Sequence, residues 1–384
     1  MQHIKTYNKI AHEGLAILQN NFIVNEFIDA PTGILLRSQN LHQEPIPSSV
    51  LAVARAGAGV NNIPVSEMTQ RGIVVFNTPG ANANAVKELV ITSLLLASRD
   101  IIGGINWTRN LKGEDIDGQV ESGKIAFRGP EIYGKSVLVI GLGAIGVKVA
   151  NALVSLGMQV MGFDPYISVD AAWGLDTNVK KAEQLDLALS QADFVSIHIP
   201  MTKVTQGFFN EERIAHLKKG AKIINLSRGE IVNDDHMIAA LDKGEISKYI
   251  TDFPNPKIIQ HPSVIAIPHL GASTPESEVN CAIMAARSLK EYIINGNISK
   301  SVNFPSVHLE RSSEHRLAFC HQNIPNMISQ ISGAMAANNI NIVNLINKSK
   351  DQIAYTILDI DQAVNEKVIK SLSEIQGMIK VRNL

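Results

Sequence analysis

Two polar stretches that follow apolar runs hold side chains able to take part in a reaction. Arg228 comes after the apolar run 221–226, and His269 comes after the apolar run 264–267. The guanidinium of an arginine can hold a 2-oxo acid by its carboxylate and keto oxygens. A histidine can donate a proton to the alkoxide that forms when hydride arrives, and it can accept that proton in the reverse direction. These residue types predict redox chemistry on a 2-hydroxy or 2-oxo acid, provided that a hydride carrier binds nearby.

A glycine-rich turn offers a place for that carrier. Gly141, Gly143 and Gly146 are spaced as GxGxxG between an apolar run and a helical segment, and Asp164 follows the next apolar run. The first glycine permits a tight turn, the second lets the backbone approach a pyrophosphate, and the third lets the helix pack on the strand. Asp164 can accept both ribose hydroxyl protons and would repel a 2′-phosphate, which favours NAD over NADP. The predicted cofactor residues here are Gly141, Gly143, Ala144, Ile145, Gly146 and Asp164.

A parallel sheet is needed to bring these residues together. Short β-branched runs alternate with helix-period segments, which indicates a wound α/β fold. We expect strands at 33–36, 50–54, 73–76, 136–140, 159–163, 194–199, 221–226, 249–251 and 264–267, and long helices at 83–99 and 275–295. Because ligands bind at the carboxyl ends of parallel strands, Arg228 and His269 should lie at the same edge as the glycine turn.

The last part of the chain has a different pattern. A strand at 316–321, a helix at 325–337, strands at 340–346 and 353–360, a helix at 364–372 and a strand at 378–381 predict a small βαββαβ module. The Ser- and Asn-rich segment 299–313 is interpreted as a linker. We therefore predict a substrate domain over 1–93 and 275–310, a cofactor domain over 94–274, and a C-terminal domain over 314–384.

Composition narrows the class of protein. The 384 residues are 45% hydrophobic and 18% charged, which is typical of a globular protein with sizeable cores. A formal net charge of −1 argues against nucleic acid as a partner. The two cysteines give neither a disulfide framework nor metal-ligand spacing, so no metal is expected. With no apolar signal core and no membrane-length run, we expect a cytoplasmic protein that does not bind membranes.

Several of these stretches carry a family resemblance. They are the Arg55-Ala-Gly-Ala-Gly-Val-Asn-Asn-Ile63 segment, the glycine turn, the Ser227-Arg-Gly-Glu-Ile-Val232 segment and the Pro268-His-Leu-Gly-Ala-Ser-Thr274 segment. Together they resemble the D-isomer-specific 2-hydroxyacid dehydrogenase family, and most of all its phosphoglycerate dehydrogenase branch. The resemblance implies a Rossmann-type NAD domain, a flavodoxin-like substrate domain and an ACT-like C-terminal module. It also implies NAD-dependent oxidation of 3-phospho-D-glycerate, with Arg228 anchoring the substrate and His269 as the acid and base.

The same resemblance assigns further residues. Leu226, Ser227, Asp252, Gly271 and Ala272 would line the nicotinamide side, and His198, Pro200 and Thr205 the adenosine side. In the first domain, the backbone of Gly57, Ala58 and Gly59 can form an anion nest for a carboxylate. Arg37, Ser38 and Arg55 are candidates for a phosphate group, which favours several cations.

The C-terminal module resembles the ACT regulatory domain. His321, Asn323 and Asn341 match positions that bind L-serine in some family members, and their amide and imidazole groups suit an amino acid. The alternative is a module used only for assembly. Asn326 stands where the family usually has glycine, which weakens the prediction that serine binds. Lobes and modules of this type usually form homodimers or homotetramers.

One departure from the family concerns the histidine. The family typically carries a glutamate about five residues after the Asp252 position, which supports the histidine, and Lys257 stands there instead. Either Asp234, Glu230 or Asp252 takes over that role, or His269 works without a carboxylate. Two competing functions remain open, a glyoxylate or hydroxypyruvate reductase and an NAD-sensing protein similar to a corepressor.

Overall fold

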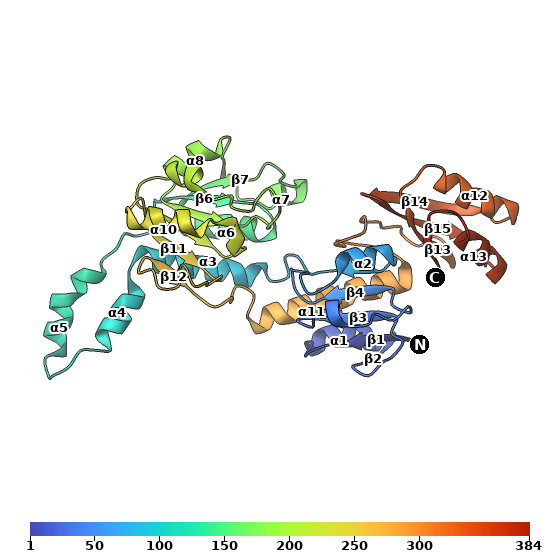
Figure 1. The fold of residues 1–384 in the computed structure, drawn as a ribbon, viewed down its shortest axis with the longest axis horizontal. Coiled ribbons are helices and arrows are strands. Elements are labelled where there is room, and N and C mark those ends of the chain that lie inside the picture. Colours follow the sequence, from blue (N-terminus) through green and yellow to red (C-terminus); the bar gives the residue numbers. More distant parts are fainter. The chain divides into compact units, whose positions relative to one another are not determined.

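The structure is a computed structural model that describes residues 1–384 (Figure 1). Its contacts group into two compact units. Unit 1 consists of Met1–Asn82 and Pro275–Leu384, and unit 2 consists of Ala83–Thr274. None of the helices combines the length and the apolar character needed to cross a lipid bilayer.

Unit 2 is built on a seven-stranded parallel sheet of order β12-β11-β10-β9-β6-β7-β8. Its strands are β6 (Ser136–Ile140), β7 (Gln159–Phe163), β8 (Lys180–Lys181), β9 (Phe194–Ile197), β10 (Ala221–Asn225), β11 (Ile246–Thr251) and β12 (Val264–Ala266). The chain winds one way from β6 to β8 and the other way from β9 to β12, so the order reverses between β6 and β9. That reversal is the Rossmann topology, and the predicted fold class is confirmed for this unit.

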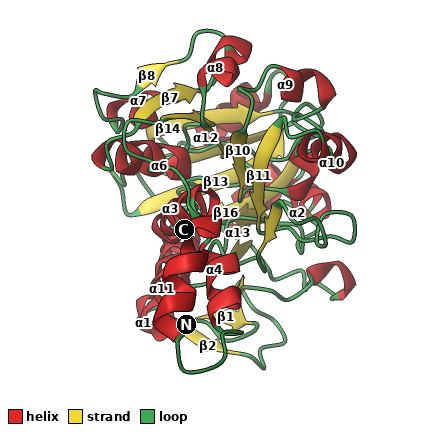
Figure 2. Ribbon diagram, turned by 90° about the vertical axis from the view of Figure 1, so that its left-hand side faces the viewer, coloured by secondary structure: helices red, strands yellow, loops and turns green.

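Helices cover both faces of this sheet, because its strands are apolar on both sides. The helices of the unit are α3 (Ala83–Ser98), α4 (Ile101–Thr108), α5 (Ile116–Gly123), η2 (Lys124–Phe127), α6 (Ala144–Ser155), α7 (Val169–Trp173), α8 (Leu185–Gln191), α9 (Glu211–Ala215), η3 (Gly229–Ile231) and α10 (Asp234–Asp242). Residues of α3 and α6 form the core on one face, and residues of α8, α9 and α10 form it on the other (Figure 2). The predicted domain boundary at residue 93 falls inside α3, and the whole helix groups with unit 2 because Val86, Val90 and Leu94 pack under this sheet.

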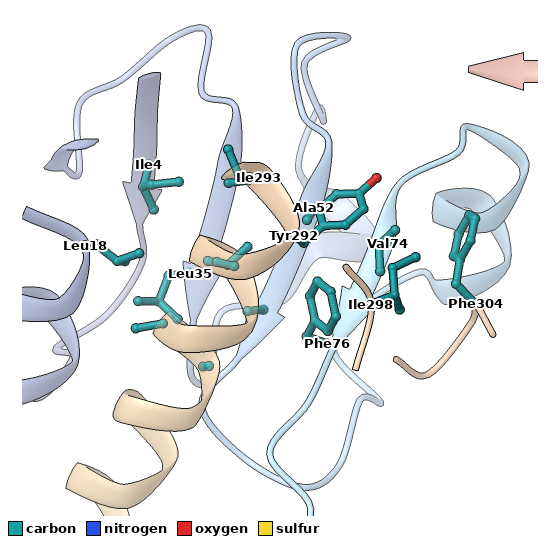
Figure 3. Packing of buried hydrophobic residues seen from close by; sticks show 14 of the residues in the cluster. Ile4, Leu18, Leu35, Ala52, Val74, Phe76, Tyr292, Ile293, Ile298 and Phe304 are labelled. Carbon is teal, nitrogen blue, oxygen red and sulfur yellow. The ribbon is translucent and has the colours of Figure 1, made fainter. Parts of the chain in front are cut away.

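Unit 1 contains a five-stranded parallel sheet of order β2-β1-β3-β4-β5, the flavodoxin-like order. Its strands are β1 (Gln2–Thr6), β2 (Phe22–Asn25), β3 (Gly33–Leu36), β4 (Ala52–Arg55) and β5 (Val74–Phe76). Its helices are α1 (His12–Gln19), η1 (Leu41–Gln43), α2 (Val65–Gln70) and α11 (Pro275–Asn295). Figure 3 shows the core under α11, where Ile4, Leu35, Ala52 and Phe76 of the strands meet Tyr292 and Ile293 of the helix.

The C-terminal module has a four-stranded antiparallel sheet of order β14-β15-β13-β16 and the predicted βαββαβ sequence of elements. Its elements are β13 (His315–Gln322), α12 (Met327–Ala337), β14 (Ile342–Lys350), β15 (Ile353–Ile360), α13 (Glu366–Ser373) and β16 (Met378–Asn383). One face packs on α12 and α13. The other face joins the core of the five-stranded sheet through Ala318, Cys320, Tyr355 and Ile357.

Side chains of the module donate hydrogen bonds to the carbonyl groups at the C-terminal end of α11. Arg382 donates to the carbonyl oxygens of Tyr292 and Ile293 at 3.1 and 2.8 Å. Arg316 donates to the oxygen of Asn295 at 3.0 Å, and the Tyr355 hydroxyl donates to the oxygen of Gly296 at 2.9 Å. The last carbonyl groups of a helix have no partner within the helix, so these contacts satisfy them and fix the module on the sheet.

The prediction of a linker over 299–313 is wrong. Ile298, Phe304 and Val307 are buried, and the Phe304 ring meets the Tyr355 ring edge-on. The Asn303 side chain accepts from the backbone N–H of Val75 and donates to the carbonyl oxygen of Ile73. It therefore satisfies backbone groups at the free edge of β5. Ser301 also donates to the Val75 oxygen, so two of the polar residues in this segment pair with a strand edge.

Candidate active site

The glycine turn between β6 and α6 has the geometry that a dinucleotide needs. Gly141 has a φ of +91°, and a Cβ there would lie 2.6 Å from the carbonyl oxygen of His198. A Cβ on Gly146 would overlap the carbonyl oxygen of Gly141, so helix and strand could not approach as closely. Nothing lies within 4 Å of the Cβ position of Gly143, which leaves its backbone open to a ligand. Ala144 and Ile145 form the first turn of α6, where backbone N–H groups point out of the helix.

Asp164 directly follows β7 and lies beside the same turn. Its carboxylate accepts the amides of Leu142 at 2.8 Å and Tyr166 at 2.9 Å, which fixes its orientation. A pocket of about 400 Å³ opens next to it, lined by apolar side chains such as Leu175 and Val179. Each carboxylate oxygen has a second lone pair for a ribose hydroxyl. The turn, the helix end and this carboxylate therefore fit NAD.

The predicted adenosine-side residues follow β9, the neighbour of β6. The His198 amide donates to the Ile140 oxygen at 2.7 Å, and the His198 ring shares a hydrogen bond of 2.8 Å with the Ser196 hydroxyl. Burial lowers the pKa of His198 to about 4, so the ring is neutral at physiological pH. The Thr205 hydroxyl donates to the Pro200 oxygen at 2.6 Å, which closes the loop that they share.

Arg228 is held by the turn after β10. The Asn225 side chain donates to the Arg228 carbonyl oxygen at 2.9 Å and accepts from the Ser227 amide at 3.2 Å. The Ser227 hydroxyl donates to the Ile197 oxygen at 2.8 Å, and Leu226 is buried below the turn. The exposed guanidinium of Arg228 makes one hydrogen bond, to the oxygen of Ser227 at 2.6 Å. Its other N–H groups are free to bind an anion.

His269 lies beyond β12, against the end of β11. Its ring packs on the Phe253 ring with 4.8 Å between centroids and 48° between planes. Asp252 directly follows β11 and is 1% exposed. Its Oδ2 accepts the Gly271 amide at 3.3 Å, while its Oδ1 has no partner. Burial raises the pKa of Asp252, although the charges of His269 and Arg228 oppose that shift. Arg228 and His269 follow the strands on either side of β11, so both candidate reactive side chains lie near this buried carboxylate. Ala272 follows Gly271 in the loop after β12.

The other carboxylates considered for His269 have different partners. Asp234 accepts from the Asn255 side chain at 2.9 Å, and Lys257 binds Asp235 at 2.7 Å. Glu230 is exposed and lies in η3. Among the candidates, an electrostatic interaction with His269 is found for Asp252.

The predicted substrate residues gather in unit 1, at the carboxyl ends of β3 and β4. Leu36 of β3 pairs with Arg55 of β4, so Arg37 lies one residue beyond the position opposite Arg55. Arg55 Nε donates to the Arg37 oxygen at 2.8 Å, and the amide of Ser38 donates to Asn8. The Gly57 amide donates to the Arg55 oxygen at 2.9 Å, so it is occupied within the loop. The amides of Ala58 and Gly59 make no hydrogen bond within the chain.

The module residues matched to serine binding are partly occupied. The ring nitrogens of His321 bond the Gln322 oxygen at 2.8 Å and the Thr356 hydroxyl at 2.9 Å, and the residue is 2% exposed. The Asn323 side chain donates to the carbonyl oxygen of Asp351, and the backbone N–H of Asn341 donates to the Asp361 carboxylate. Asn326 adopts a φ of +71°, the conformation for which glycine is favoured.

The sequence did not predict two residues near these sites. Phe253 contacts His269, and its place directly after a strand-end aspartate was the available signal. Glu278, in the first turn of α11, pairs with Arg37 at 2.8 Å. Its pairing comes from the tertiary fold, and no local pattern indicates it.

Comparisons with known proteins show the family to which the chain belongs. A family profile described as D-isomer specific 2-hydroxyacid dehydrogenase, NAD binding domain, matches residues 91–271. D-3-phosphoglycerate dehydrogenase of Haemophilus influenzae is 32% identical over 350 residues, covering 87% of this chain and 81% of that protein. The enzyme of the same name from Bacillus subtilis is 29% identical over 330 residues, and this chain spans 60% of its length.

Solved structures share the fold. NAD⁺-bound 3-phosphoglycerate dehydrogenase of Entamoeba histolytica superposes with a TM-score of 0.61 at 24% identity, covering 79% of this chain and 98% of that one. D-mandelate dehydrogenase of Rhodotorula graminis superposes with a TM-score of 0.68 at 19% identity, covering 81% of this chain and 99% of that one.

Proposed function

Because the chain belongs to the D-isomer-specific 2-hydroxyacid dehydrogenase family, we propose that it oxidises 3-phospho-D-glycerate to 3-phosphooxypyruvate, the first step of L-serine biosynthesis. The chain is an NAD-dependent 2-hydroxyacid dehydrogenase, and the choice of substrate is the proposal. The observation that carries it is the position of Arg228 and His269, which follow β10 and β12 on either side of Asp252 at the end of β11. Relatives named for this reaction support the choice at about 30% identity.

Arg228 anchors the substrate in this proposal. The guanidinium binds the carboxylate and the C2 oxygen, and the turn built by Asn225 keeps it at the end of β10. An arginine is suited to this task because it stays charged and offers a planar fork of donors. Replacement by lysine would keep the charge and lose the fork.

His269 moves the proton. In the oxidation a ring nitrogen accepts the C2 hydroxyl proton while the C2 hydrogen leaves with its electron pair, and the 2-oxo acid results. Bound NAD supplies the acceptor for that hydride. The negative charge of Asp252 stabilises the imidazolium, and the Phe253 ring holds the imidazole plane. In this chain Asp252 thus takes the supporting role of the family's glutamate.

The phosphate of the substrate belongs with Arg37, Ser38 and Arg55, at the ends of β3 and β4. The amides of Ala58 and Gly59 suit a carboxylate, because small residues let an anion approach the backbone. The Gly57 amide already donates to the Arg55 oxygen, so Gly57 shapes the loop and does not itself donate to the carboxylate.

Steady-state kinetics test the reaction. We expect NADH-dependent reduction of 3-phosphooxypyruvate to be preferred over that of hydroxypyruvate and glyoxylate. His269→Asn should lower kcat by about 100- to 10,000-fold, while the exposed His216→Asn should leave it unchanged. Higher kcat/KM with glyoxylate or hydroxypyruvate would make the chain a reductase of those acids. Tight NADH binding with no turnover would favour an NAD sensor.

Regulation by L-serine is part of the same proposal. Since the His321 ring is bonded inside the sheet and the Asn323 side chain already donates to the Asp351 oxygen, Asn323 Oδ1 and the side chain of Asn341 are the groups left to contact an amino acid. Turnover should fall when serine is added, and Asn341→Ala should reduce that inhibition while leaving turnover without serine unchanged. Turnover that ignores serine would leave assembly as the role of the module.

A further inference from the structure

The side chain of Arg37 has one partner, and that partner is an acid. Arg37 Nη1 lies 2.8 Å from Glu278 Oε1, and the two side chains are 42% and 45% exposed. Both residues belong to unit 1, where Arg37 follows β3 and Glu278 lies in the first turn of α11. Arg37 is the cation at the end of β3 that could bind an anion, and it is already paired with the Glu278 carboxylate.

The backbone beneath this ion pair is held rigidly. The Arg37 oxygen accepts from Arg55 Nε at 2.8 Å and also from Asn62. The Asn8 side chain accepts the amides of Ser38 and Gln39 at 2.9 and 2.8 Å. The backbone is thus fixed at this strand end, while the guanidinium itself is held only by Glu278. A change of partner requires a side-chain movement and no rearrangement of the loop.

The ion pair is weak enough to exchange. An exposed pair of this kind contributes little to stability, because water screens both charges and ordering two long side chains costs entropy. A phosphate monoester carries close to two negative charges and three acceptor oxygens, so it binds a guanidinium better than one carboxylate does. A substrate with a phosphate can displace Glu278, whereas a substrate without one gains nothing from doing so.

We propose that Glu278 is a specificity-determining residue, an exchangeable counter-anion that occupies Arg37 until the phosphate of the substrate replaces it. This inference rests on the proposed function. Glu278 neutralises Arg37 when no phosphate is present, which lowers the attraction of this strand end for free anions. An anion can then bind Arg37 only if it binds the guanidinium more strongly than the Glu278 carboxylate does.

The substitution Glu278→Gln tests the exchange, because it removes the competing charge and keeps the size of the side chain. We expect KM for 3-phosphooxypyruvate to fall about two- to fivefold. KM for hydroxypyruvate, which lacks only the phosphate, should stay unchanged. Inorganic phosphate should become a stronger competitive inhibitor by a similar factor.

Two variants separate this pair from general charge effects. Glu276→Gln removes a charge from the same turn of α11 but no ion partner of Arg37, so it should not change the ratio of the two KM values. In the Arg37→Gln background, Glu278→Gln should have no further effect on KM for the phosphorylated substrate. Thermal melting of each variant checks that the helix stays folded.

An unchanged KM ratio in Glu278→Gln would overturn the proposal, and so would an equal effect of Glu276→Gln. A higher KM for 3-phosphooxypyruvate would show that Glu278 positions Arg37 instead of competing for it. If the wild type does not prefer the phosphorylated substrate, the proposed function fails, and binding of inorganic phosphate followed by ³¹P NMR then decides the exchange separately. Stronger phosphate binding by Glu278→Gln would support it, and equal binding would refute it.

Discussion

Asp252 in unit 2 and Asp359 in the C-terminal module are both almost fully buried, at 1% and 0% exposure. They differ in their hydrogen bonding and in the direction of their pKa shifts. Asp359 accepts two parallel hydrogen bonds from Arg316, at 2.6 and 2.9 Å, and two more from Ser312. Although burial alone would raise its pKa, those donors lower the pKa of Asp359. Asp252 has one oxygen without a partner, and burial raises its pKa.

The difference separates two uses of a buried charge. A carboxylate that serves the fold is fully paired, because any unpaired oxygen in the interior costs free energy. In the proposed function, Asp252 serves chemistry, and it keeps one unsatisfied oxygen near His269 and Arg228. The substitutions below test this distinction, from the largest expected effect to the smallest.

Asp359→Asn should destabilise unit 1 by about 3–5 kcal/mol, because it leaves the Arg316 guanidinium buried without a counter-charge. Urea unfolding measures the loss. The exposed Asp361→Asn in the same module is the control and should cost far less. A loss below about 1 kcal/mol would mean that the buried ion pair does not hold the fold.

Asp252→Asn should lower kcat about 10- to 100-fold while stability stays equal or rises. An amide oxygen can still accept the Gly271 amide, and the unpaired buried charge disappears. Loss of the charge beside the imidazolium should also move the upper pH limit of keto acid reduction downward. Asp234→Asn is the matched control, and the assignment of Asp252 fails if both variants give the wild-type pH profile.

Tyr355→Phe should cost about 1 kcal/mol, because it removes one neutral hydrogen bond to the Gly296 oxygen. The effect should be smaller than that of Asp359→Asn, since no charge is stranded. Tyr166→Phe, at a side chain that is 92% exposed, should have no effect on the same unfolding curve. Equal losses at Tyr355 and Asp359 would remove the distinction between neutral and charged contacts at this junction.

Acid should affect the two aspartates in opposite directions. The pKa of Asp359 is lowered, so its contribution to stability is present above the ordinary value of 3.8 and is lost as the pH falls through the lowered pKa. The pKa of Asp252 is raised, so its destabilising effect at neutral pH fades as the pH falls through the raised pKa toward 3.8. Unfolding of wild type and of each Asn variant between pH 2 and 7 measures both differences. Parallel curves for all three would contradict the pKa directions.

Much of the fold could be predicted because it depends on local sequence. The GxGxxG turn sits between an apolar strand and a helix, and β6, β7, β9, β10 and β12 of the seven-stranded sheet were located within two residues of their observed bounds. Only the second half of β11 was predicted, and the two-residue strand β8 was missed. The strands β1 and β2 were missed, because Gln2–Thr6 and Phe22–Asn25 mix polar and apolar residues and are partly exposed. Arg228 and His269 could be singled out because they follow strands, and Asp252 directly follows the strand between those two.

What could not be predicted depends on partners far away in the sequence. Asn303 bonds to Ile73 and Val75, and Glu278 pairs with Arg37, so polar residues there look like ordinary surface residues. His321 was matched by position to a ligand-binding residue, while its hydrogen bond to Thr356 requires the neighbouring strand β15. Local composition indicates the element, and tertiary pairing decides what each polar side chain does.

The closure of α11 by Arg316, Tyr355 and Arg382 bears on how the chain loses its structure on heating. The helix, the sheet under it and the C-terminal module share one continuous core, so none of them can melt while the others keep their contacts. A calorimeter should therefore record no more than two transitions for three segments with separate sequence signatures. A damaging change anywhere in the module would then also unfold the five-stranded sheet that carries Arg37 and Arg55.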